Sequence, residues 1–180
     1  MTAPRIAGLM IIAALAAGIV LRIYNHGVSF RSADEVIYTW QADTIAEYGG
    51  NGMGTMLDSY NKEKELWKFP PPTRIGYLWP LSYFMELTGI HDERAGSYLS
   101  LIFNIMALMF LAAFALKYFN GWIALYAVLL MGVSAMDIVI SRRAWQDAVF
   151  GSLGFLLVYA ASEVIRSEER RVGKECTIQC

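Results

Sequence analysis

Side chains that could do chemistry stand in three short polar segments between long apolar stretches. They are Asp34 and Glu35 in the first segment, Arg94 in the second, and Arg142, Arg143 and Asp147 in the third. A carboxylate can take a proton from an attacking hydroxyl or amine, and arginine binds phosphate oxygens through paired donors. Each charge alone is also typical of a membrane helix end. Together they predict a site that activates a nucleophile beside an anionic group.

The composition indicates a membrane protein. The 180 residues are 56% hydrophobic and 17% charged, with a formal net charge of −1, whereas soluble domains are roughly 45–50% apolar. A near-neutral chain without a basic run gives no support to nucleic-acid binding. Cys176 and Cys180 both lie in the last residues, which excludes a disulfide framework or a cysteine metal site in the membrane body. His26 and His91 lack ligand spacing.

Four apolar segments approach the roughly 20 residues that a membrane-spanning helix needs. They are residues 6–24, 95–116, 121–140 and 148–165. Arg5 before the first span favours a cytoplasmic start, which places Asp34 on the outer side. Arg22 ends this span, and we expect its side chain to snorkel toward the membrane surface.

The polar stretch at 25–94 forms the first outer loop in this interpretation. Residues 33–48 are typical of a helix lying on the membrane surface. Its predicted apolar stripe consists of Val36, Ile37, Trp40, Ile45 and Tyr48. The glycines at 50–54 predict a flexible loop after it, and the alternating charges at 62–68 predict a solvated surface.

Residues 75–89 decide how the three polar segments are arranged. This apolar stretch contains Pro80 and Glu86 and is short for a span. If it crosses the bilayer, Asp34 and Asp147 end on opposite faces. If it lies in the interface, both share the outer face with Arg94, and Arg142 and Arg143 are also outside, against the positive-inside bias. Two arginines on the outer side, against this bias, suggest that they bind an anionic ligand.

The order of these segments resembles the start of a family of polytopic glycosyltransferases. These C-type fold enzymes include protein O-mannosyltransferases and lipid A aminoarabinose transferases. The resemblance rests on ADEVIY at 33–38, PPTRIGYLWPLSYFMELTG at 71–89, ERAGSYLSLIFNI at 93–105 and SRRAWQD at 141–147, and covers nearly all of residues 1–165. The chain departs from the family pattern at Thr73 and Arg74, where Leu and an aromatic residue are commoner, and at Val149, where proline is frequent.

The resemblance implies an all-α membrane protein with about four transmembrane helices and membrane-surface helices in the first outer loop. It also implies an inverting enzyme that moves a sugar from a polyprenyl-phosphate donor to a protein, lipid or glycan acceptor. The reaction would take place at the outer face of a prokaryotic inner membrane.

The site residues follow from the same resemblance and from the chemistry of their side chains. Asp34 is the expected base, supported by Glu35, which could also hold a metal-bound water. Donor phosphate would be bound by Arg94, Arg142 and Arg143, with Asp147 in a supporting role. A divalent cation between Asp34 and Asp147 is compatible with these ligands, and no other cofactor is implied.

Two other classes of function compete with this interpretation. A transporter or flippase part would use intramembrane acids such as Asp137 for ion coupling. An assembly or anchor subunit would leave the polar segments without a ligand.

Residues 166–180 differ in character from the rest of the chain. RSEERRVGKEC at 166–176 looks like an in-frame translation of a sequencing adapter, although its charges alone would also allow a basic cytoplasmic helix end. We expect the natural sequence to be cut at about Ile165, which would make this chain an N-terminal fragment of a longer glycosyltransferase. Four spans are too few to enclose a lipid donor, and we expect residues 1–165 alone to be inactive in transfer.

Overall fold

The structure is a computed structural model that describes residues 3–24, 26–28 and 32–178. Within these ranges the chain is helical and contains no strand, which confirms the all-α prediction. The α-helices are α1 (Ala3–Ile23), α2 (Ala33–Lys62), α3 (Ile75–Thr88), α4 (Glu93–Tyr118), α5 (Gly121–Gly132), α6 (Ala135–Ser141) and α7 (Gln146–Ile178). Two 3-10 helices, η1 (His26–Val28) and η2 (Lys64–Lys68), join them. Helix α7 continues without a break through the predicted boundary at 165.

Three described helices are long and apolar enough to cross a membrane: Arg5–Ile23 in α1, Glu93–Tyr118 in α4 and Gln146–Glu168 in α7. The expected span at 121–140 is instead two helices, because α5 and α6 meet at an angle of 62°, the geometry of a broken span or of a re-entrant loop. Ser134 caps the start of α6 by accepting the Asp137 N–H at 3.3 Å, so the chain restarts a helix directly after the break. Length and composition thus support three spans, or four if the bent α5–α6 pair counts as one, against the prediction of about four.

Arg22 is buried at the break and does not snorkel, which corrects the sequence prediction. Its Nε donates to Asn104 Oδ1 at 2.5 Å, and its Nη1 donates to the Gly18 and Gly132 carbonyls at 3.0 Å each. Its Nη2 donates to the Met131 carbonyl at 3.0 Å. The last carbonyls of a helix lack partners and carry the negative end of its dipole, so the end of α5 is a favourable place for this guanidinium.

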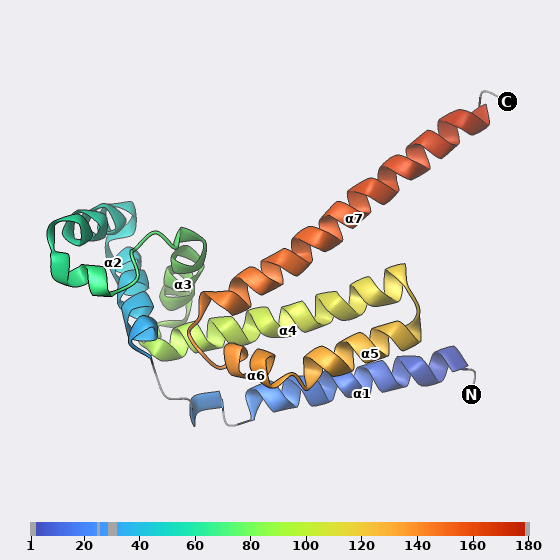
Figure 1. The fold of residues 1–180 in the computed structure, drawn as a ribbon, viewed down its shortest axis with the longest axis horizontal. Helices are drawn as coiled ribbons and strands as arrows, with labels where there is room; N and C mark the ends of the chain where they lie inside the picture. Colours follow the sequence, from blue (N-terminus) through green and yellow to red (C-terminus); the bar gives the residue numbers. More distant parts are fainter. Residues whose placement is uncertain (1–2, 25, 29–31, 179–180) are drawn as a thin grey trace.

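Helices α2 and α3 pack together at one end of the bundle (Figure 1). Helix α2 bends at Gly49, whose φ of +59° suits glycine, and then stays helical to Lys62. The predicted flexible loop at 50–54 is therefore wrong. No residue of η2 is buried, which agrees with a solvated surface at 62–68.

The buried face of α2 also differs from the predicted apolar stripe. Val36, Trp40 and Tyr48 are exposed, whereas Ile45 is buried. The face that packs inward carries Glu35, Tyr38, Thr39, Gln41, Ala42 and Ile45. The helical period was predicted correctly, but polar side chains with partners on neighbouring segments displace apolar ones from the inner face.

Helix α3 is too short to cross a bilayer. Its 14 residues extend about 21 Å, against a hydrocarbon core of about 30 Å. The segments between Asp34 and Asp147 that are apolar enough to cross are then α4 and, if it counts as one span, the bent α5–α6 pair. Accordingly, the starts of α2 and α7 lie at the same end of the bundle (Figure 1).

Candidate functional site

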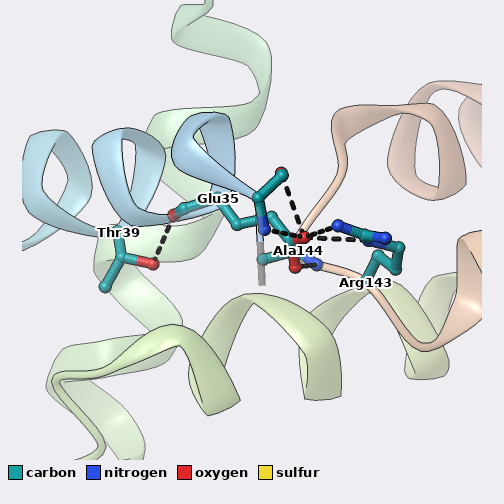
Figure 2. A network of polar contacts seen from close by, with 5 residues as sticks. Glu35, Thr39, Arg143 and Ala144 are labelled. Carbon is teal, nitrogen blue, oxygen red and sulfur yellow. Dashed lines mark hydrogen bonds and ion pairs between the residues drawn. The ribbon is translucent and has the colours of Figure 1, made fainter. Parts of the chain in front are cut away.

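Glu35 joins the start of α2 to the turn between α6 and α7 (Figure 2). Its side chain is 0% exposed. Oε1 accepts from Ser32 N at 3.0 Å, Ser32 Oγ at 3.1 Å and Arg143 Nε at 2.8 Å, and it forms a closer contact with Arg143 Nη2. Oε2 accepts from Ala144 N at 3.0 Å, and the Glu35 carbonyl accepts from Thr39 Oγ1 at 2.8 Å.

These contacts keep Glu35 ionised. Burial alone would raise the pKa of its carboxyl, but the N–H groups of Ala144 and Ser32 and the Arg143 guanidinium outweigh burial and lower it. A carboxylate with this many donors has little capacity left for a substrate. Glu35 therefore ties together the two segments that carry Asp34 and Asp147.

An open hollow of about 230 Å³ lies beside this junction. It is lined by Asp34, Tyr38, Arg74, Trp145, Gln146 and Asp147. Asp34 and Asp147 are both exposed, although they come from different helices. The structure therefore brings together the predicted base and the predicted supporting acid.

Arg74 is the cation of this hollow. Its guanidinium contacts the Tyr38 hydroxyl and lies 5.0 Å from the centre of the Tyr38 ring. Among the described residues it has no ion pair, so most of its N–H groups remain available. A phosphate in the hollow could accept paired hydrogen bonds from it.

The three arginines predicted to bind phosphate do not line the hollow. Arg94 is exposed and pairs with Asp92 at 2.7 Å, so the expected convergence of Arg94 with the two acids is not found. Arg142 donates from Nη2 to the Leu21 carbonyl at 2.6 Å. Arg143 is bound to Glu35, and its guanidinium lies 4.7 Å from the centre of the Trp145 ring.

Asp34 and Asp147 are the residues that could hold a cation in the hollow. In the described part of the chain, no group of three or more His, Cys, Asp or Glu side chains is arranged to bind a metal ion. A cation between the two acids would need its remaining ligands from substrate or water. Cys176 and Cys180 lie outside the residues whose side chains are described.

Asp147 also borders a smaller pocket, of about 70 Å³, at the break in the α5–α6 span. Asp137, Asn104 and Ser152 contribute the other polar side chains of its lining. Ser152 and Asn104 are both buried. The acid that the sequence interpretation assigned to a transporter, Asp137, therefore lies at the broken helix.

Sequence reasoning missed Tyr38, Arg74, Trp145 and Gln146 as lining residues. Tyr38 stands four residues after Asp34, a spacing that puts both on one helix face. Arg74 was noted only as a departure from the family pattern. A cation in place of an aromatic residue just after a proline run was the available signal.

Comparisons with known proteins add no information about this site. A scan against protein-family models, a search of curated proteins and a search of solved structures returned no match. Length and apolar composition of the helices indicate an integral membrane protein.

Proposed function

We propose that the chain carries the catalytic hollow of an inverting glycosyltransferase. Its donor is a sugar on a polyprenyl phosphate, and its site faces the outer side of a cell membrane. The observation that carries the proposal is the hollow in which Asp34, Asp147 and Arg74 meet, at one end of helices able to cross a membrane. It supplies proton acceptors and an anion-binding group in one place.

The reaction uses these side chains in a single displacement. The acceptor hydroxyl or amine gives its proton to the Asp34 carboxylate as its oxygen or nitrogen bonds to the anomeric carbon. The bond from that carbon to the phosphate oxygen breaks, and the electron pair leaves with the phosphate. Arg74 stabilises the phosphate charge, an interaction that strengthens as the bond breaks. Asp147 orients the acceptor or a cation.

Asp34→Asn tests the proposal in the complete protein encoded by the open reading frame. Transfer from a radiolabelled polyprenyl-phosphate sugar should fall by about 100-fold or more, since a general base contributes about that factor. The matched control is Asp58→Asn, another exposed acid on α2, which should retain full transfer. Full activity in Asp34→Asn would remove Asp34 as the base.

The broken span favours ion-coupled transport as the second candidate. Discontinuous helices build the substrate and ion sites of many transporters, and acids within membrane segments often belong to ion or proton pathways. Asp137 lies in the first turn of α6, directly after the break. Transport predicts that Asp137→Asn abolishes uptake or flipping in vesicles and that Asp34→Asn does not. Glycosyl transfer predicts the opposite ranking.

A further inference from the structure

Two parts of the chain line the hollow of Asp34. Tyr38 and Arg74 come from α2 and from the residue before α3, and the Arg74 guanidinium contacts the Tyr38 hydroxyl. Trp145 and Gln146 come from the turn before α7 and from its first residue. The proposed function uses the two acids and the arginine of the hollow. It gives no task to Trp145 or Gln146.

Trp145 is the aromatic ring of the lining that a ligand can reach. The other ring, that of Tyr38, is only 2% exposed. It is covered by the Arg74 guanidinium, 5.0 Å from its centre, and by the edge of Tyr77, with ring centres 5.8 Å apart. Trp145 is half-buried, so part of its side chain remains open.

The position of Trp145 is fixed before any ligand binds. Its carbonyl accepts from Ser100 Oγ at 3.1 Å, and its N–H donates to the Arg143 carbonyl at 2.8 Å. The Arg143 guanidinium lies 4.7 Å from the ring centre and is itself paired with Glu35. Arg143 covers one face of the indole, which leaves the other face and the edge for a ligand. A surface that is already ordered loses little entropy on binding.

Unpaired polar groups surround this ring. Among the described residues, the side chains of Asp34, Gln146 and Asp147 have no hydrogen-bond partner. The Gln146 amide offers two donors and an acceptor, and the carboxylates accept. A sugar complements such a lining, because its hydroxyls donate and accept at the edge while its C–H groups pack against an aromatic face.

The size and charge of the hollow narrow the choice of sugar. Its volume of about 230 Å³ is below the range of about 300–1,000 Å³ that is typical of pockets for drug-sized ligands, which suits a single ring. The lining carries two carboxylates against the one guanidinium of Arg74, and Arg143 is paired elsewhere. A carboxylate on the sugar would therefore meet charges of its own sign.

We propose that Trp145 and Gln146 form the subsite for the sugar of the donor, and that this subsite favours an uncharged sugar over one that carries a carboxylate. The sugar ring packs against the indole, one of its hydroxyls pairs with the Gln146 amide, and the phosphate lies at Arg74. This assignment rests on the proposed glycosyltransferase function and names the residues that set its sugar preference.

The test isolates the part of the donor affinity that comes from the sugar. Isothermal titration uses the complete protein in lipid nanodiscs and three short-chain polyprenyl phosphodiesters. They carry a neutral hexose, a hexuronic acid, or a methyl group that keeps the phosphodiester charge without a sugar. The hexosyl lipid should bind about tenfold more tightly than the methyl lipid, through one aromatic contact and one hydrogen bond. The hexuronosyl lipid should bind more weakly than the hexosyl lipid.

The outcomes separate this proposal from the proposed function. Equal affinity for the hexosyl and methyl lipids would overturn the sugar subsite and keep the polyprenyl-phosphate donor. Affinity for the hexuronosyl lipid equal to that for the hexosyl lipid would overturn the preference for an uncharged sugar. Absence of binding by all three lipids would overturn the proposed function and the subsite with it.

Substitutions then locate the sugar. Trp145→Leu should weaken binding of the hexosyl lipid about fivefold, roughly the value of one aromatic contact, and Trp145→Phe should weaken it less. Gln146→Ala should weaken it about fivefold through loss of one hydrogen bond. Binding of the methyl lipid should not change in these variants. Trp79→Leu is the matched control, because Trp79 is 49% exposed on α3 and does not line the hollow.

Two results with these variants would overturn the subsite. One is hexosyl-lipid affinity equal to that of the control in both Trp145→Leu and Gln146→Ala. The other is an equal loss for the hexosyl and methyl lipids, since that would mean that the two residues support the fold of the hollow and do not contact the sugar. Circular dichroism of each variant checks that the helical content is unchanged.

Fluorine NMR reports the contact directly. The protein is labelled with 5-fluorotryptophan, and the resonance of Trp145 is the one absent from Trp145→Phe. This resonance should shift on addition of the hexosyl lipid and stay in place with the methyl lipid. The same shift with both lipids would place the phosphate at the indole and overturn the sugar contact.

Discussion

The buried ionic contacts and the open hollow use the same side-chain types in opposite ways. Arg22 and Glu35 are both 0% exposed and are surrounded by protein partners. Arg74 and Asp34 lie at the hollow, where protein partners leave most of their hydrogen-bonding capacity free. Buried charges need complete pairing because an unpaired one is costly. In this chain, charged groups whose hydrogen bonds are all made within the protein hold the structure together. Charged groups with free hydrogen-bonding capacity are the candidates for chemistry.

Arg22→Met should give the largest loss of stability. The substitution removes four hydrogen bonds and leaves the Met131 and Gly132 carbonyls and Asn104 without their donor. We expect a loss of about 3–5 kcal/mol, because each buried acceptor left without its donor costs about 1–3 kcal/mol. Reversible unfolding in mixed detergent micelles measures it. Arg5→Met, an exposed arginine on the same helix, is the control, and equal stability of the two variants would contradict a structural role for Arg22.

Glu35→Gln should give the next largest loss of stability. The amide keeps the shape of the side chain, but it weakens the pair with Arg143 and turns one acceptor into a donor that faces Ser32 or Ala144. A loss of about 2–3 kcal/mol is expected from hydrogen bonds to a charged group. The same unfolding assay tests this value, and a change below about 0.5 kcal/mol would contradict the anchor.

Glu35 also predicts the direction of a pH effect. The pKa of its carboxyl is lowered in the folded protein relative to the ordinary value of 4.5, so the folded state favours the ionised form. The resulting stabilisation is complete above the ordinary value and is lost as the pH falls through the lowered one. As the pH is lowered from neutral into this acid range, the free energy of unfolding should fall in the parent chain and should fall less in Glu35→Gln. Equal acid sensitivity in both chains would exclude Glu35 as a source.

The sequence predicts the helices of this chain better than their buried faces. Long apolar runs fix the spans by length alone, so α1, α4 and α7 were found. The break at 133–134 was missed because Val133 continues the apolar run and Ser134 interrupts it only briefly. The partner that stabilises the broken end, Arg22, also comes from over 100 residues earlier.

The site was predictable only where local spacing carried the information. Asp34 and Asp147 could be paired once 75–89 was taken as interfacial. Ser32 and Glu35 form the S-x-x-E pattern of a helix start. This local signal for the anchoring contacts of Glu35 was overlooked because Glu35 was considered only as an acid. The partners of Arg94 and Arg142, and the position of Arg74, depend on tertiary packing that no local pattern contains.

Arg74→Ala tests whether Arg74 binds the donor phosphate in the place predicted for Arg94, and it measures binding separately from stability. Polyprenyl phosphate should bind the variant roughly tenfold more weakly, because one charge-assisted contact to phosphate is lost. Arg94→Ala, at an exposed arginine already paired with Asp92, should bind as the parent does. Isothermal titration in nanodiscs measures both. A larger loss in Arg94→Ala would restore the prediction made from sequence.

Asp34→Asn should give the smallest change in stability and so completes the comparison with its neighbour. Asp34 is exposed and faces the hollow, whereas Glu35 faces inward, although one peptide bond separates them. Surface substitutions usually change the free energy of unfolding by less than about 0.5 kcal/mol, and we expect this result beside a loss of about 2–3 kcal/mol in Glu35→Gln. A stability loss in Asp34→Asn as large as that in Glu35→Gln would mean that both acids serve the junction. The hollow would then lose its free carboxylate from α2, and with it the argument for a base at this position.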